Sequence, residues 1–393
     1  MEKNIIKICE QKIRGDLNLS WEDLAEKFNF KNGEMLRQQF KAYRKRIGTL
    51  PSKTEHITKE LELKLSELDK KTMEMEKEKI KLQRTKLDIK RWLRNQAKFD
   101  LMVEHIENAI VNLEPINVPK LNIRPSGKKT AIIGLADIHY GKRILIRGLY
   151  DEIINRYDAD IFEDRMWELY HEIVRISNKE ELDEVHIVNL ADAVDGLLHI
   201  KQLQEAEFGV IDSVMKLSEF LAIWLNELSK HVFVNYHSTL GNHPEVRPLN
   251  TKAGELDKEN MERIIHEFIR LRLSNNQNIN IHACDKVSFM NIFGLNILSV
   301  HGQLEKGNLE NSLKDYMIMY KTPIDILLSG HLHSNKSQNI GIDVEVIQFN
   351  SICGADDYGF KIHKTSNAGT RMLILEEGKG KTIDYNISLQ HIY

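Results

Sequence analysis

The sequence predicts an α/β domain preceded by an all-α N-terminal arm. Three features of the chain predict this division. Residues 54–113 contain no proline or glycine, which favours one long helix. Residues 114–128 hold three prolines, and short apolar runs alternate with helical stretches after them. Strands that alternate with helices are typical of sheets covered by helices.

Length and composition allow more than one domain and exclude several classes of protein. The chain has 393 residues, enough for a domain of about 250 residues and an additional N-terminal module. Hydrophobic residues make up 41% and charged residues 29%, which excludes a wholly disordered chain. The net charge is only −3, so any basic surface must be local.

The cysteines and the lack of long apolar runs predict a soluble, cytoplasmic protein that makes no contact with membranes. Cys9, Cys284 and Cys353 are scattered and form no metal-binding pair, which fits a reducing compartment. No apolar run approaches the roughly 20 residues that span a bilayer. The first residues of the chain lack the pattern of a signal peptide.

Residues 1–50 read as helical and resemble a helix-turn-helix. Ser20 and Asp23 are spaced as an N-cap and its reciprocal carboxylate, and a helix follows them. A second helix, over about residues 33–47, carries basic residues at Arg37, Lys41, Arg44, Lys45 and Arg46. Two short helices around a tight turn, the second one basic, are typical of DNA-binding modules. A small helical bundle with a solvated basic face is the alternative.

Residues 51–113 are predicted to form a long basic helix and a coiled coil. Alternate steps of four and three residues give Leu61, Leu65, Leu68, Thr72, Met75, Lys79, Leu82, Lys86, Ile89 and Leu93, of which seven are apolar. Residues 70–100 carry eleven Lys or Arg and five Asp or Glu. This charge fits a solvated face or contact with a phosphate backbone. The helix could pair with a second chain, giving a homo-oligomer, or fold back within its own chain.

Residues 114–128 read as a linker and residues 129–393 as the α/β domain. Five apolar runs in this domain read as buried strands, over residues 130–136, 185–191, 232–240, 295–300 and 324–329. The segments that follow them are Asp137-Ile-His139, Asp192-Ala-Val-Asp195, Gly241-Asn-His243, His301-Gly302 and Gly330-His331-Leu-His333. In α/β sheets, ligands bind beyond the carboxyl ends of the strands. We therefore predict that these five segments form one site.

The residue types in these segments suit a pair of divalent metal ions. Carboxylates, imidazoles and an amide oxygen are the donors expected around two cations that act on phosphoryl groups. Because side chains alternate along an extended strand, an Asp-x-His or His-x-His segment is expected to place both side chains on one side. Flanking glycines allow the backbone to turn tightly next to the metal ions.

These five segments, in this order, resemble the motifs of the calcineurin-like metallophosphoesterase family, which includes SbcD-type DNA-repair nucleases. The resemblance covers about residues 130–335 and implies a four-layer α/β/β/α sandwich. It implies that Asp137, His139 and His333 bind one metal ion, that Asn242, His301 and His331 bind a second, and that Asp192 bridges them. It also implies that His243 is catalytic rather than a ligand. The implied reaction is attack of metal-activated water on phosphorus.

Two departures from the family pattern stand out. Ala191 precedes Asp192 where the family has glycine, and Pro244 follows His243 where the family has an acid. The small alanine is expected to be tolerated, whereas Pro244 could shift the group that orients His243. The helical arm also precedes the catalytic segments, an order more similar to metallophosphoesterases of phages and prophages than to SbcD-type enzymes.

Other residues are candidates for substrate contacts. His199 lies seven residues after Asp192, and Tyr358 and Lys361 lie in a glycine-flanked run expected to form a loop over the metal cleft. Asp195 is expected to support the site rather than to bind metal.

Three functions remain open from the sequence. The first is a two-metal-dependent nuclease or phosphodiesterase acting on DNA. The second is a phosphatase or phosphodiesterase acting on small nucleotides or phosphoproteins. The third is a DNA-binding or scaffold protein with a vestigial metal site. The mixed donor set suits manganese, iron or zinc. Manganese is the expected metal, with iron, zinc, nickel and magnesium as alternatives.

Overall fold

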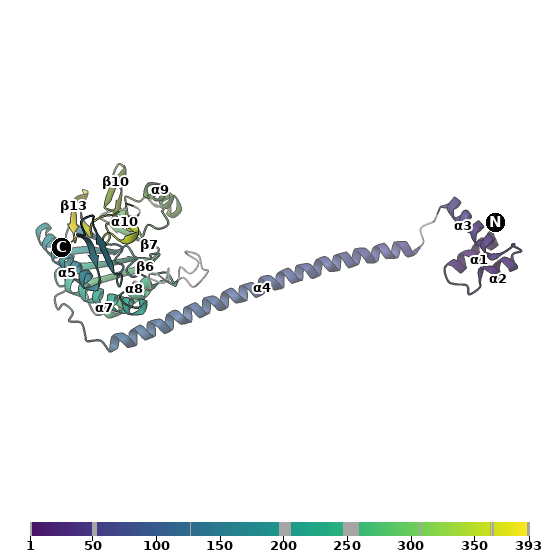
Figure 1. Cartoon of the computed structure of the whole chain (residues 1–393), viewed down its shortest axis with the longest axis horizontal. Coiled ribbons are helices and arrows are strands. Elements are labelled where there is room, and N and C mark those ends of the chain that lie inside the picture. Colours follow the sequence, from purple (N-terminus) through teal and green to yellow (C-terminus); the bar gives the residue numbers. More distant parts are fainter. Residues whose placement is uncertain are drawn as a thin grey trace. The chain divides into compact units, whose positions relative to one another are not determined.

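The computed structural model of the chain describes residues 2–48, 53–125, 127–195, 206–246, 259–305, 308–361, 363 and 365–390 (Figure 1). The chain divides into two compact units, Met1–Gln96 and Ala97–Tyr393. His199 lies outside the described residues.

The N-terminal unit begins with three short helices around a small apolar cluster. These are α1 (Lys3–Ile13), α2 (Trp21–Lys27) and α3 (Gly33–Ile47), and they enclose Cys9, Leu24, Ala25, Leu36 and Phe40. The predicted cap of α2 is present, because Ser20 Oγ accepts a hydrogen bond from the Asp23 amide and Asp23 Oδ2 accepts one from the Ser20 amide. The basic residues predicted on α3 are all exposed.

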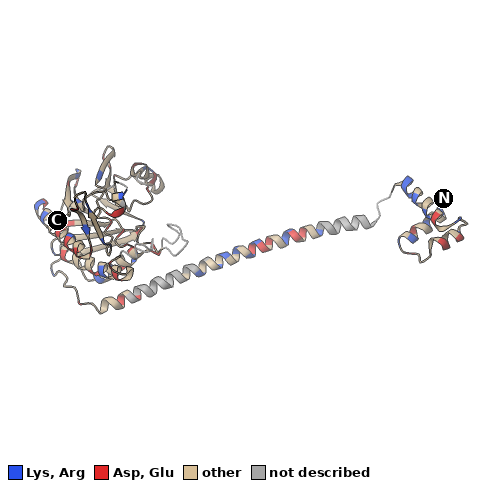
Figure 2. Cartoon of the chain, in the orientation of Figure 1, with Lys and Arg blue, Asp and Glu red and all other residues tan. Residues whose placement is uncertain are grey.

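Helix α4 (Lys53–Val111) forms the rest of the arm. Six of the apolar residues predicted to form the coiled-coil seam are more than half exposed in the single chain: Leu65, Leu68, Met75, Leu82, Ile89 and Leu93. Figure 2 shows basic and acidic residues interspersed along the described part of this helix. The predicted all-α arm is confirmed, and its apolar seam is left uncovered by the described residues.

The C-terminal unit contains two sheets and one hairpin. The first sheet has the order β13-β12-β1-β4-β5-β6, and the second has the order β10-β11-β9-β8-β7. The strands of the first sheet are β1 (Lys129–Leu135), β4 (Glu184–Asn189), β5 (Phe233–Thr239), β6 (Ile279–Asp285), β12 (Gly369–Glu376) and β13 (Gly380–Ser388). Those of the second are β7 (Val287–Ile292), β8 (Leu295–Val300), β9 (Ile326–Ser329), β10 (Lys336–Gly341) and β11 (Val344–Gln348). The hairpin pairs β2 (Ile144–Arg147) with β3 (Ile153–Tyr157).

The apolar residues of this unit form three clusters that separate four layers. One cluster lies between the first sheet and the helices α5 (Ala159–Glu180), α7 (Val210–Leu228) and α8 (Met261–Arg272). A second, with Ile132, Leu328 and Phe349, lies between the two sheets. A third joins the second sheet to α9 (Leu309–Tyr320). The predicted α/β/β/α sandwich is therefore confirmed.

The two sheets approach closely at a glycine. A Cβ atom on Gly134 would lie 2.5 Å from Cδ1 of Phe349, so only glycine leaves room for this ring. Strands β1, β4 and β5 run parallel as successive neighbours in the first sheet, as do β8, β9 and β11 in the second. This arrangement brings the carboxyl ends of these strands to one edge.

A buried arginine fastens the helix layer to the segment after β11. Arg165 on α5 donates hydrogen bonds to the carbonyls of Ile352 and Cys353 and to Oδ1 of Asn155. The same segment continues to the sheet edge, where Ser351 Oγ donates to the carbonyl of Asp137. Helix α5 therefore helps to hold the backbone around the predicted site.

Several elements were not anticipated from the sequence. They include β2, β3, β6 and β7, and the short helix α10 (Asp357–Lys361), which occupies part of the run expected to be a loop. The described residues of the predicted linker, 114–128, form no helix or strand, but they pack onto the domain. Asn278 Nδ2 donates to the carbonyl of Leu121, and Asn278 Oδ1 accepts from the amide of Ile123. Among the described residues, no helix is long and apolar enough to cross a membrane.

Candidate metal centre

The five predicted segments meet at the shared edge of the two sheets. The amide of Asp137 donates to the carbonyl of Ala191, and the amide of His139 donates to that of Asp192. On the second sheet, the amide of Gly330 donates to the carbonyl of His301. These bonds hold the segments beyond the strand ends in register with one another, so the predicted ligands lie together.

The backbone of this edge is left-handed at six non-glycine residues. Their φ angles are positive, between 47° and 70°: Asp137, His139, Ala191, Asp192, His331 and His333. Such angles are uncommon outside glycine and gather at functional sites. The side chains of Asp137 and His139 therefore meet through tight turns after β1, rather than through the strand alternation assumed from the sequence. The same correction applies to His331 and His333.

The first cluster of donors consists of Asp137, His139 and His333. Asp137 Oδ1 lies 3.4 Å from Nε2 of His333 and 4.0 Å from Nε2 of His139. The other oxygen, Oδ2, accepts a hydrogen bond of 2.8 Å from the amide of His331. Oδ2 of Asp137 thus anchors the backbone at His331, while Oδ1 faces the imidazoles of His139 and His333.

The second cluster consists of Asp192, His301 and His331. Nε2 of His301 lies 2.9 Å from Asp192 Oδ2, 3.2 Å from Asn242 Oδ1 and 3.2 Å from His331 Nδ1. On the other side of the ring, Nδ1 of His301 donates to the carbonyl of Leu190 at 2.7 Å. This bond fixes the tautomer that leaves Nε2 free to bind a metal ion.

A third cluster links the first two, because it shares His139 with the first and Asp192 with the second. It contains His139, Asp192 and His243, with Nε2 of His243 4.0 Å from Asp192 Oδ2. Oδ1 of Asp195 accepts two hydrogen bonds, one from Nδ1 of His139 at 2.8 Å and one from Nδ1 of His243 at 2.7 Å. The carboxylate predicted to support the site therefore orients two imidazoles at once. Geometry alone places His243 close enough to act either as a ligand or as a proton donor.

Burial and opposite charges act against each other on the pKa values of these groups. Burial raises the pKa of Asp137, but His333 and His301 outweigh it and hold the pKa at about 2. Burial lowers the pKa of His301, but Asp192 outweighs it and raises the pKa to about 9. Burial, together with His301, lowers the pKa of His331 to about 4. The carboxylates are thus ionised and His331 is neutral, as a metal ligand requires, whereas His301 carries a proton on Nε2 that a metal ion would displace.

The donor set fits a divalent metal ion. Oδ1 of Asp137 is buried and accepts no hydrogen bond from the described part of the chain. A buried carboxylate oxygen without a donor is costly unless a cation completes it. Mixed carboxylate and imidazole donors suit divalent transition metals. Within each of the three clusters, the ligand atoms lie within 4.8 Å of one another, so each cluster could hold a metal ion.

Two charged residues near the site were missed from the sequence. Nζ of Lys142 lies 2.9 Å from Asp356 Oδ2 and 4.0 Å from Asp195 Oδ2. Burial lowers the pKa of Lys142, but the two carboxylates outweigh it, so the group stays charged. The position of Lys142, three residues after His139, was the available sequence signal. This lysine ties the segment before α10 to the carboxylate that orients His139 and His243.

Tyr358 and Lys361, the other two predicted substrate contacts, stay predictions. The side chain of Tyr358 lies outside the described residues, and Lys361 is exposed at the last residue of α10.

Comparisons with known proteins give the family of the chain. A family model described as the YonJ coiled-coil domain matches residues 71–113, which confirms the predicted coiled coil. The SPbeta prophage-derived protein YonJ of Bacillus subtilis strain 168 is 32% identical over 405 residues, which span 98% of this chain and 95% of that protein. The chain belongs to the YonJ family. The prophage origin of this relative confirms the predicted similarity to prophage proteins.

Solved structures resemble about two thirds of this YonJ-family chain at low identity. An archaeal phosphodiesterase is 14% identical with a TM-score of 0.30, covering 65% of this chain and 99% of its own. Vps29 from Entamoeba histolytica, solved with zinc, is 11% identical with a TM-score of 0.28, covering 66% and 99%.

The close approach of Gly241 to Asp192 gives a test of the site. A Cβ atom on Gly241 would lie 2.1 Å from Asp192 Oδ1, so Gly241→Ala displaces this carboxylate. We expect at least a tenfold loss of manganese affinity by isothermal titration calorimetry, as for changes next to metal ligands. Gly209→Ala, whose Cβ would meet only Asp212 Oδ2 at 3.8 Å, is the matched control. Equal affinity in both variants would contradict the role of Asp192.

Proposed function

We propose that this chain is a two-metal-dependent phosphoester hydrolase and that its substrate is DNA. One observation carries the hydrolase: three donor clusters overlap through His139 and Asp192 at the carboxyl edge of the parallel strands. Such overlap suits two neighbouring cations that share a carboxylate, as two-metal phosphoryl chemistry requires.

The residues divide between two metal positions. Asp137, His139 and His333 would hold one ion, with manganese the expected metal. Asn242, His301 and His331 would hold the other, and Asp192 would contribute to both. The ions supply activation of water and neutralisation of charge on the phosphoryl oxygens.

His243 is the proposed proton donor to the leaving oxygen. Its Nδ1 is held by Asp195 at 2.7 Å, and its side chain is 22% exposed, whereas that of His139 is 2% exposed. Burial lowers the pKa of His243, but Asp192 and Asp195 outweigh it, so the net shift is upward. A raised pKa favours the protonated imidazole, which is the form that a general acid requires.

The arm favours nucleic acid among the possible substrates. Its exposed basic residues on α3 follow a capped helix and a tight turn, an arrangement that suits the DNA backbone. A phosphatase or phosphodiesterase for small nucleotides or phosphoproteins is the alternative, with the arm serving only for assembly. A scaffold with a vestigial metal site is the third possibility, although each proposed ligand is present.

Removal of the shared carboxylate tests the hydrolase. With manganese, the full chain is expected to cleave linear duplex DNA and bis-p-nitrophenyl phosphate. Asp192→Asn should lower kcat/KM by roughly a thousandfold, because it disturbs both metal positions. His243→Gln should lower kcat by about a hundredfold and leave the metal content unchanged.

His171→Gln, an exposed histidine on α5, is the control and should retain activity. Hydrolysis of the model ester alone would move the substrate away from DNA. No hydrolysis with manganese, iron, zinc, nickel or magnesium would favour the scaffold.

The basic helix gives a separate test of DNA binding. Lys41→Glu combined with Arg44→Glu should weaken binding of a fluorescent duplex by at least about tenfold and should reduce its salt dependence. Lys120→Glu with Lys128→Glu, two exposed lysines outside α3, is the control for net charge. Equal losses in both pairs would show that α3 has no particular role.

Self-association through α4 is also proposed, with a second copy of the chain as partner. The exposed seam includes Leu68, 61% exposed, and Leu82, 60% exposed, and the coiled-coil family match covers Leu82. Full-length chain should sediment as a dimer at micromolar concentration. Leu68→Lys with Leu82→Lys should give monomers, whereas Gln83→Lys should not, because it lies beside the seam. A monomeric wild type would refute the dimer.

A further inference from the structure

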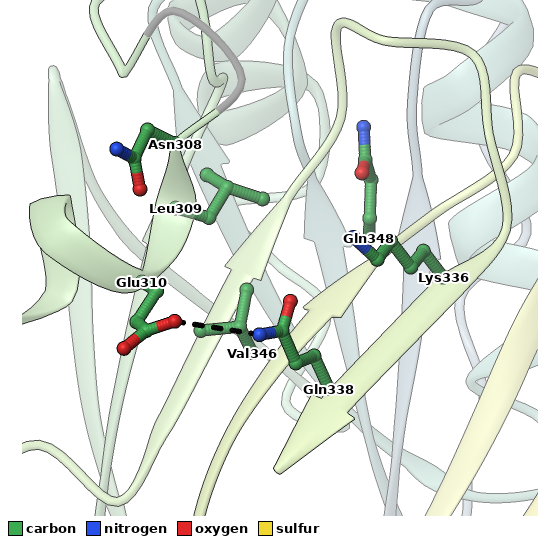
Figure 3. A pocket seen from close by; sticks show the side chains of 7 residues that line it. All are labelled: Asn308, Leu309, Glu310, Lys336, Gln338, Val346 and Gln348. Atoms are coloured by element: carbon green, nitrogen blue, oxygen red, sulfur yellow. Dashed lines mark hydrogen bonds between the residues drawn. The ribbon is translucent and has the colours of Figure 1, made fainter. Parts of the chain in front are cut away.

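A small polar pocket lies at the start of α9, on the outer face of the second sheet. Its volume is about 100 Å³. Figure 3 shows Asn308, Leu309 and Glu310 on one side and the strand residues Lys336, Gln338 and Gln348 on the other. This pocket is distinct from the donor clusters, and none of its lining residues belongs to them.

Gln348 contributes a buried amide nitrogen to the pocket. Its side chain is 3% exposed, and Nε2 makes no hydrogen bond within the described part of the chain. A buried amide donor left unpaired costs about 1–3 kcal/mol, so such a group next to a pocket points to a ligand that accepts a hydrogen bond.

The strand ladder places a cation beside this amide. Lys336 on β10 is the cross-strand partner of Gln348 on β11, so the two side chains leave the same face as neighbours. Lys336 itself is exposed. The amide and the ammonium together offer hydrogen-bond donors with a positive charge, as a phosphate group requires.

The acidic residue of the pocket is compensated. Glu310 Oε1 accepts from Lys314 Nζ at 2.9 Å, and its Oε2 accepts from Gln338 Nε2 at 3.5 Å. The start of α9, a helix of 12 residues, adds its positive dipole end to the same side. The pocket is therefore suited to an anion despite the carboxylate at its rim.

The strand pairing places the pocket close to the metal centre in the second sheet. Gln348 pairs with Ser329 on β9, and Ser329 stands two residues before His331. We propose that this pocket binds a phosphate group of the nucleic-acid substrate that flanks the scissile one. The assignment to substrate rests on the proposed function, whereas the phosphate site itself does not.

Kinetics with two substrates test the assignment to substrate. Lys336→Ala and Gln348→Leu should each raise KM roughly tenfold for oligothymidylate, which has flanking phosphates, as expected for one charged contact. Both variants should leave KM and kcat within about twofold for bis-p-nitrophenyl phosphate, which has none. Lys230→Ala, an exposed lysine at the end of α7, is the control. Equal effects on both substrates, or no effect on either, would overturn the proposal.

A metal-free measurement tests the phosphate site independently of hydrolysis. Inorganic phosphate is titrated into full-length chain with EDTA and followed by the width of its ³¹P resonance. Wild type should broaden the signal, and both variants should broaden it several-fold less; equal broadening would overturn the site. Lys336→Ala changes an exposed residue, so a folding defect in Gln348→Leu would not decide the result. Lost phosphate binding with an unchanged KM for oligothymidylate would overturn the assignment to substrate and leave a site for free phosphate.

Discussion

The apolar contact between the two sheets is the constraint on which the metal centre depends. Ile132, Leu328 and Phe349 pack in the space between them, and Gly134 leaves room for the ring of Phe349. This contact aligns the carboxyl ends of strands from two separate sheets. Each sheet alone would present part of the donor set; together they present all of it. Loss of packing here would therefore separate Asp137 and Asp192 from His301 without altering any of them.

The site also shows how the fold supports charge away from water. Asp137, Asp192 and His301 are almost fully buried, and each lies within reach of a group of opposite charge or a metal position. Isolated buried charges are costly, so the cluster persists only because its members compensate one another. The left-handed backbone at Asp137 and Asp192 is a second local cost, offset by hydrogen bonds between neighbouring segments.

The sequence was most informative about the metal ligands, because residues of a distinctive chemical type directly follow apolar runs. Asp137, His139 and His331 follow apolar runs, so their convergence could be predicted from their position at the carboxyl ends of predicted strands. The turns that bring Asp137 and His139 together could not, because φ depends on contacts with Ala191 and Asp192 that are distant in sequence. The edge strands β6 and β7 were missed because only continuous apolar runs were interpreted as strands, although the alternation of polar and apolar residues in both segments is itself typical of a half-buried strand. Lys142 and Asp356 were missed since they lie 214 residues apart.

Cys353 lies in the segment that Arg165 and Asp137 hold in place, and this position governs its chemistry. Its thiol is buried, and burial raises its pKa to about 12. Because the thiolate is the reactive form, such a cysteine is a poor target for peroxide or for alkylating reagents. The chain could therefore be handled without thiol protection at this position, because the buried, protonated sulfur stays unreactive.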